Sequence, residues 1–199
     1  MLNRTTSLGL CFVIALVSGA VQNQTAFAQE MSQRSTSAVD ATIKQARRAF
    51  KEGRYAEAEV LWRNVLKDQP NSAEAFYQLG FSLHLQEEIG SAIAAYRKAI
   101  ALKPDYDAPH MNLGLALIEL QQLDEAAKSF EQVLTLPDQP ETPASTHALA
   151  HYNLAIIQKR QEQPEQALQN VDAALKITPD FSQAQELRLQ LLNPQRQEE

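Results

Sequence analysis

Two histidines, His147 and His151, lie four residues apart in a segment whose apolar pattern predicts a helix. This spacing places both imidazoles on one face of the helix, where they could hold a metal ion. A metal site needs further ligands, and no carboxylate or third ligand follows at a known metal-site spacing. The pattern therefore favours packing roles for both side chains, with metal binding as the less favoured alternative.

The sequence offers little for covalent catalysis or phosphate binding. The single cysteine, Cys11, lies inside an apolar N-terminal run. Because no strand is predicted, no serine has the strand–turn–helix setting of a nucleophile elbow. Too few glycines follow residue 28 to build a phosphate-binding loop, and we place two of them, Gly53 and Gly90, in turns between helices. We expect neither enzymatic activity nor a cofactor.

Residues 1–28 have the features of an export signal. Arg4 supplies a positive start, residues 8–21 are an apolar run, and Ala26-Phe27-Ala28 is a small-x-small cleavage site. The run is shorter than the ~20 residues that span a bilayer. Earlier cleavage after Ala20 and an uncleaved anchor remain alternatives. The sequence thus predicts an exported protein, periplasmic or secreted, with no membrane span after cleavage.

Composition limits the class of partner. The 199 residues are 44% hydrophobic and 21% charged, which is typical of a soluble protein. The formal net charge is −6, so nucleic acid and anionic membrane surfaces are disfavoured as partners.

The elements that would position any site come from an internal repeat. Aligned on Pro70 and Pro104, which lie 34 residues apart, the sequence divides into units at 39–72, 73–106, 107–140 and 148–181. The eighth residue of each unit is small, the twentieth is alanine, and the twenty-fourth is large. In order, these are Ala46, Gly80, Gly114 and Ala155; Ala58, Ala92, Ala126 and Ala167; and Trp62, Tyr96, Phe130 and Val171.

These positions suit pairs of antiparallel helices. Small residues allow two helices to approach closely, the large residue fills the space toward the next pair, and proline ends the second helix. Pro137 comes one residue early in unit three, which predicts an early end to that helix. Residues 141–147 are a proline-rich insertion, interpreted as a tolerated surface loop or, less favoured, a recognition loop. We expect residues 29–38 and 193–199 to be disordered.

This pattern resembles the tetratricopeptide repeat (TPR), and residues 73–106 follow its helix–turn–helix consensus almost position for position. The resemblance implies an all-α, right-handed α-solenoid of about four repeats. Residues 182–192 predict one more amphipathic helix, which would cap the last repeat.

In TPR arrays the first helix of each unit lines a concave groove. Transferred position by position, this implies a basic stripe, an apolar track at the fifth and ninth positions, and amides at the sixth. These residues are Lys44, Arg47 and Lys51; Tyr77, Phe81, Met111, Leu115, Tyr152 and Ile156; and Gln78, Asn112 and Asn153.

Each feature has a functional and a structural interpretation. The track is a partner site or packs within the array, and the amides bind a peptide backbone or are ordinary polar residues. The stripe docks an acidic segment or, more favoured, is a solvated face. We expect a non-catalytic interaction module of the cell envelope that binds an extended or helical segment of another protein. Self-association as a homo-oligomer is the main alternative, and metal binding is less favoured.

Overall fold

The computed structural model describes residue 33, residues 36–140 and residues 144–193. Within these ranges the regular structure is helical, with no β-strand. An N-terminal helix, described over residues 36–51, precedes the labelled helices. They are α2 (Tyr55–Asp68), α3 (Ala73–His84), α4 (Ile89–Leu102), α5 (Asp107–Glu119), α6 (Leu123–Leu134), α7 (Thr146–Arg160), α8 (Pro164–Ile177) and α9 (Ser182–Leu192).

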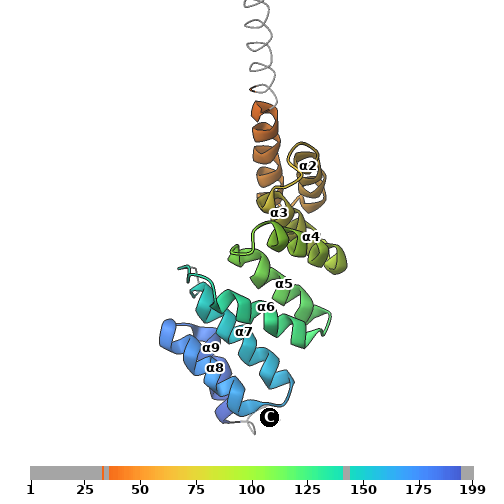
Figure 1. The fold of residues 1–199 in the computed structure, drawn as a ribbon. Helices are drawn as coiled ribbons and strands as arrows, with labels where there is room; N and C mark the ends of the chain where they lie inside the picture. Colours follow the sequence, from red (N-terminus) through yellow and green to blue (C-terminus); the bar gives the residue numbers. More distant parts are fainter. Residues whose placement is uncertain (1–32, 34–35, 141–143, 194–199) are drawn as a thin grey trace, which may run out of the picture.

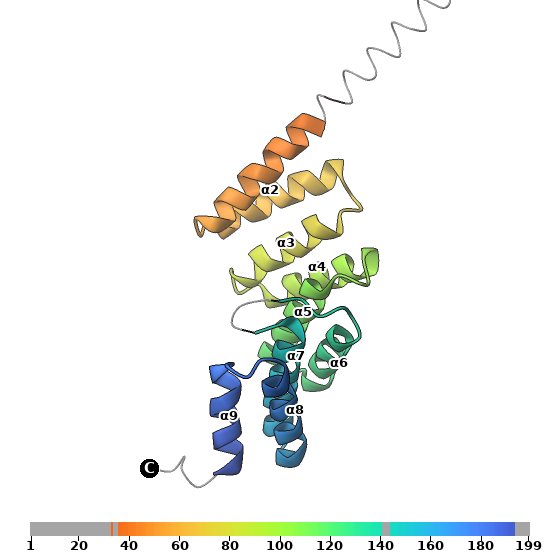
Figure 2. The ribbon, with the colours of Figure 1, turned by 90° about the vertical axis from the view of Figure 1, so that its left-hand side faces the viewer.

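The helices stack in pairs, one pair after another. Each helix from α2 onward packs against its neighbours in sequence, most closely within the pairs α3–α4, α5–α6 and α7–α8. Figures 1 and 2 show the stack running from the N-terminal helix at the upper end to α9, which lies beside α7 and α8 at the lower end. The all-α solenoid that the sequence predicts is confirmed.

Small residues at the eighth position allow the two helices of a pair to meet. A Cβ added to Gly80 would lie 2.8 Å from ring carbons of Tyr96, and one added to Gly114 would lie 2.6 Å from Phe130. Both rings come from the twenty-fourth position of the same unit. The large residue therefore packs inside its own pair, rather than only toward the next pair as the sequence suggested.

The turn inside each pair has the same backbone conformation. Gly53, Glu87, Gln121 and Glu162 have φ values of 75°, 64°, 59° and 59°, and each is the fifteenth residue of its unit. Only the first turn uses glycine, the residue that adopts this left-handed region without steric cost. The placement of Gly90 in a turn was wrong, because Gly90 is the second residue of α4.

The insertion is tied to the array at its base. The Asp138 carboxylate accepts hydrogen bonds from the Thr146 hydroxyl (3.1 Å) and the His147 amide (2.9 Å). Gln139 and Thr146 also exchange two bonds, from Thr146 N to Gln139 O (2.9 Å) and from Gln139 N to the Thr146 hydroxyl (3.0 Å). Burial alone would raise the pKa of Asp138, but the bonds donated by His147, Ser145 and Thr146 outweigh burial and lower that pKa.

Several helix ends differ from the sequence boundaries. α7 begins at Thr146, inside the expected insertion, because the Ser145 hydroxyl accepts a hydrogen bond from the Ala148 amide and caps the helix there. Residues 36–38, expected to be disordered, are helical because each extends a helix anchored by buried Val39. α6 ends at Leu134, three residues before Pro137, whereas α4 ends two before Pro104. The signal segment (1–28), residues 29–32, 34–35 and 141–143, and the tail 194–199 lie outside the described residues.

The core forms two clusters that meet at α7. The larger cluster extends from the N-terminal helix to Ala150, Leu154 and Ile157 of α7. The smaller one joins Ala148 and Ala155 on another side of α7 to α8, α9 and the loop before α7. α7 therefore links a three-pair block to a C-terminal block. In the described part of the chain, no helix combines the length and apolar character needed to cross a membrane.

Candidate protein-binding groove

The apolar track is half-exposed, and its N-terminal end contacts the neighbouring unit. Phe50 of the N-terminal helix packs on Phe81 of α3, with ring centroids 4.9 Å apart, and Tyr77 lies 6.1 Å from Phe81. Tyr77 also contacts Tyr106 edge-on at 5.3 Å. Phe50 stands at the twelfth position of its unit, which the TPR resemblance also implies for the groove lining.

The structure divides the track between the two core clusters. Four of its residues pack against the larger cluster and two against the smaller: Tyr77, Phe81, Met111 and Leu115, then Tyr152 and Ile156. All six side chains are partly buried. Each side chain therefore packs on the core with one part of its surface and exposes the other part to solvent.

The amide row is more occupied than the sequence suggested. Asn112 Nδ2 donates to the Tyr77 hydroxyl (3.2 Å) and to Ala108 O (3.0 Å), so both of its N–H groups are used. Asn153 is buried and donates to Leu149 O at 2.9 Å. Gln78 is half-buried. At Asn112, the carbonyl oxygen is therefore the group left to bind a ligand.

The basic stripe is exposed and partly neutralised. Arg47 pairs with Glu74 of the next unit, with 3.2 Å between Nη2 and Oε1. Lys44 and Lys51 are exposed and form no ion pair with a described residue. Within the described part of the chain, the stripe thus keeps two positive charges without an ion-pair partner.

The histidines are engaged in separate places. His147 Nε2 lies 2.8 Å from Leu136 O, and His151 Nδ1 lies 2.7 Å from Asn170 Oδ1. His84 joins the Tyr96 hydroxyl (3.3 Å) to Glu119 (2.8 Å). Among the described residues no three histidine, cysteine or acidic side chains gather in a way that could hold a metal ion. Each ring instead joins neighbouring elements of the array.

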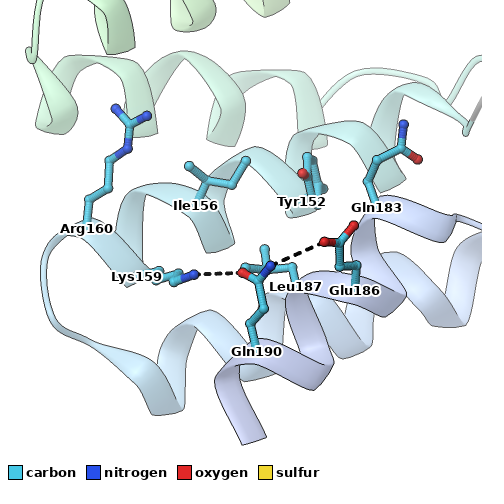
Figure 3. A pocket seen from close by; sticks show the side chains of 8 residues that line it. All are labelled: Tyr152, Ile156, Lys159, Arg160, Gln183, Glu186, Leu187 and Gln190. Carbon is cyan, nitrogen blue, oxygen red and sulfur yellow. Dashed lines mark hydrogen bonds between the residues drawn. The ribbon is translucent and has the colours of Figure 1, made fainter. Parts of the chain in front are cut away.

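A pocket of about 460 Å³ lies between α7 and α9. Figure 3 shows its lining, with Lys159 and Arg160 at one end and Gln183 at the other. α7 contributes Tyr152, Ile156, Lys159 and Arg160, and α9 contributes Gln183, Glu186, Leu187 and Gln190.

Sequence reasoning assigned α9 only a capping role and missed its four lining residues. The missed signal is the period itself. Counted from Ser182, these residues stand at the second, fifth, sixth and ninth positions, and the last three are the positions of the track and the amides in the other units. α9 therefore lines a pocket together with α7 in addition to covering the end of the stack.

Tyr152 forms one side of this pocket. Its ring lies 5.0 Å from that of Phe181, which precedes α9. Burial raises the pKa of Tyr152, and the negative charge of Glu186 adds to the effect. The phenol therefore stays protonated at neutral pH and can donate a hydrogen bond.

The stacked helix pairs define a helical repeat protein, a fold that supports protein–protein interaction. Two family models described as tetratricopeptide repeat match residues 43–107 and 83–144, and together they cover about half of the chain. The chain belongs to the tetratricopeptide repeat family.

Relatives of known identity share this repeat within larger proteins. The chain is 28% identical over 141 residues to human protein O-mannosyl-transferase TMTC3, a match covering 67% of this chain and 15% of that protein. It is 29% identical over 99 residues to the peroxisomal targeting signal receptor of Kluyveromyces lactis, covering 50% of this chain and 18% of that one. The chain thus spans less than a fifth of either relative.

Solved structures match over most of the array. PilF of Pseudomonas aeruginosa superimposes with a TM-score of 0.69 at 22% identity, over 81% of this chain and 71% of that one. MamA of Desulfovibrio magneticus does so at 0.62 and 19%, over 81% and 97%. YrrB, described as a TPR protein with an unusual peptide-binding site, gives 0.65 at 26% identity, over 77% and 76%. The PilF and MamA matches show the shared fold alone.

Proposed function

We propose that the face formed by the N-terminal helix, α3, α5, α7 and α9 binds an extended or helical segment of a partner protein. The observation that carries this proposal is the half-exposed aromatic and aliphatic track along the first helices. Exposed apolar surface of this kind is stabilised when a partner covers it. Within the family the chain is a protein–protein interaction module, and the proposal assigns that activity to one face.

Polar groups beside the track support a peptide as the occupant. The Asn112 carbonyl can accept a hydrogen bond from a peptide N–H, and Lys44 and Lys51 can attract acidic residues at one end. The peptide-binding site named in the description of YrrB supports the same type of ligand.

We place this activity in the periplasm or outside the cell. Support comes from residues 1–28, where Arg4, the apolar run and the Ala26-Phe27-Ala28 site match an export signal. N-terminal sequencing of the protein recovered from the envelope fraction tests this placement. A mature chain starting at Gln29 is the expected result, and an intact Met1 in the cytoplasmic fraction would contradict it.

Affinity capture from the envelope fraction tests the groove. The test variant carries Phe81→Asp and Leu115→Asp, which place charges on the track. The matched control carries Val60→Asp and Leu102→Asp, whose side chains are 55% and 40% exposed on the second helices α2 and α4. We expect the test variant to lose partners that the control and the wild type retain.

Equal recovery by both variants would show that the groove is not the site. Circular dichroism checks that each variant keeps wild-type helicity. If the aspartates lower it, Phe81→Gln with Leu115→Gln replaces the test pair, because glutamine is uncharged and favours helix.

Self-association is a second candidate, favoured by the last helix. Leu189 and Leu192 of α9 are 61% and 47% exposed and lie at the end of the stack. Light scattering at several concentrations tests this, with Leu189→Asp as the variant. A mass that rises with concentration in the wild type but not in the variant is expected from an oligomer. A monomer at every concentration would contradict it.

A further inference from the structure

We propose that the pocket between α7 and α9 recognises an acidic side chain that lies next to an apolar one in the partner segment. This inference rests on the proposed function, because it specifies the chemistry of the same partner at the C-terminal end of the groove.

The apolar part of the pocket fits one hydrophobic side chain of a bound segment. Leu187 is buried at the base, and Tyr152 and Ile156 are half-exposed beside it. The volume of about 460 Å³ lies within the ~300–1,000 Å³ range of ligand sites. A side chain entering here would be covered by residues from two helices.

The end of the pocket formed by Lys159 and Arg160 has more cationic than anionic side chains. The Arg160 side chain forms no hydrogen bond or ion pair with a described residue, whereas the side chain of every other described arginine pairs with a carboxylate. Lys159 donates to a neutral acceptor, Gln190 Oε1, at 2.8 Å. Two neighbouring cations at one end of the pocket therefore have no carboxylate partner among the described residues.

The local carboxylate does not neutralise these cations. Glu186 Oε1 accepts a weak bond from Gln190 Nε2 at 3.4 Å, so Gln190 stands between Glu186 and Lys159. A partner carboxylate beside Arg160 could accept two parallel N–H bonds from the guanidinium. The position of Glu186 would repel an acid placed further along the pocket, which fixes the direction of the bound segment.

Peptide selection followed by titration tests the inference. A phage library of random dodecapeptides is selected on the wild-type protein, and the most enriched peptide is synthesised with a fluorescent N-terminus and an amidated C-terminus. We expect Asp or Glu next to an aliphatic or aromatic residue. In fluorescence anisotropy, changing that acid to its amide should weaken binding about five- to tenfold, as expected for a partly exposed charge pair.

The pocket is then tested by a double variant, Lys159→Gln with Arg160→Gln. It should bind the acidic peptide about five- to tenfold more weakly than wild type and no longer distinguish acid from amide. The control, Lys128→Gln with Lys176→Gln, removes the same charge from exposed positions on α6 and α8 and should bind as wild type does.

Each remaining outcome counts against the pocket assignment. An enriched peptide that depends on Phe81 but not on Lys159 and Arg160 overturns it and leaves the proposed groove intact. Tighter binding after Glu198→Gln with Glu199→Gln would identify the protein's own tail as the occupant, again overturning it. A selection that enriches no peptide counts against both the pocket and the groove.

Discussion

The turn inside each helix pair places its fifteenth residue in the left-handed backbone region, and three of the four turns do so without glycine. Glu87, Gln121 and Glu162 have φ near +60°. Their side chains form no hydrogen bond or ion pair with the described residues, so removing them costs no such interaction. The array therefore carries the same backbone strain three times.

Replacing these three residues with glycine should stabilise the protein. A non-glycine residue in this region costs about 1–2 kcal/mol, and the greater entropy of unfolded glycine offsets about 0.5–1 kcal/mol of the relief. The net gain is about 0.5–1 kcal/mol for each site. The sites lie in different pairs and should add, giving about 1.5–3 kcal/mol for Glu87→Gly, Gln121→Gly and Glu162→Gly together.

Thermal and urea unfolding, followed by circular dichroism, measure this gain. For a domain of this size the triple variant should melt roughly 5–10 °C above wild type. Two control variants make the opposite change and replace a glycine with alanine. Gly53→Ala should lose about 1 kcal/mol, because φ is +75° there. Gly90→Ala should gain about 0.5–1 kcal/mol, because Gly90 lies in α4 and an added Cβ would meet no atom within 4 Å. Destabilisation by Glu87→Gly, as for glycine in an ordinary loop, would refute the strain argument.

Three further predictions concern the core, the insertion and alkaline pH. Gly114→Ala should lower the free energy of unfolding by about 1–2 kcal/mol in urea titrations, because the added Cβ would lie 2.6 Å from Phe130. Phe130→Leu in the same chain should restore part of this loss. The absence of any rescue would contradict this packing. Asp138→Asn should lower the melting temperature at pH 7 but not near pH 2. The reason is that a carboxyl group with a lowered pKa stabilises the fold above about pH 4, and this contribution is lost as pH falls through the lowered pKa. An equal loss at both pH values would disprove the electrostatic role. Burial raises the pKa of the Tyr96 phenol, with smaller contributions from Tyr77 and Glu119. The contribution of the neutral phenol to the stability of the fold is therefore complete below about pH 10 and is lost as pH rises further. A urea midpoint unchanged at pH 11 would contradict this.

The repeat made most of the fold predictable from the sequence. The small eighth residue, the large twenty-fourth and the closing proline each have one structural role, so their spacing fixed the helix pairs and their order. The observed helix ends differ from the expected boundaries where a local hydrogen bond determines the end of the helix. Capped by Ser145, α7 begins at Thr146, two residues before the expected unit, and this capping bond depends on a loop whose course the 34-residue period does not set.

The candidate site was less predictable because contacts between units determine it. Nothing in the sequence near Asn112 indicates that its amide is used by Tyr77, which is 35 residues away. That no described carboxylate pairs with Arg160 likewise emerges only from the three-dimensional arrangement of the helices. By contrast, the lining role of α9 follows from counting the period beyond Phe181.

The hydrogen bonds that join Asp138 and Gln139 to Thr146 and His147 hold the two ends of the insertion together. The geometry of the stack should therefore not depend on the length of the insertion. Because both ends of this segment are held together, we expect α6 and α7 to keep their contact when residues are added between residue 140 and residue 144. The position is therefore a natural graft point for protein engineering. A fluorophore-binding tag, a protease site or a second domain could be spliced in there with the groove left free on the first helices.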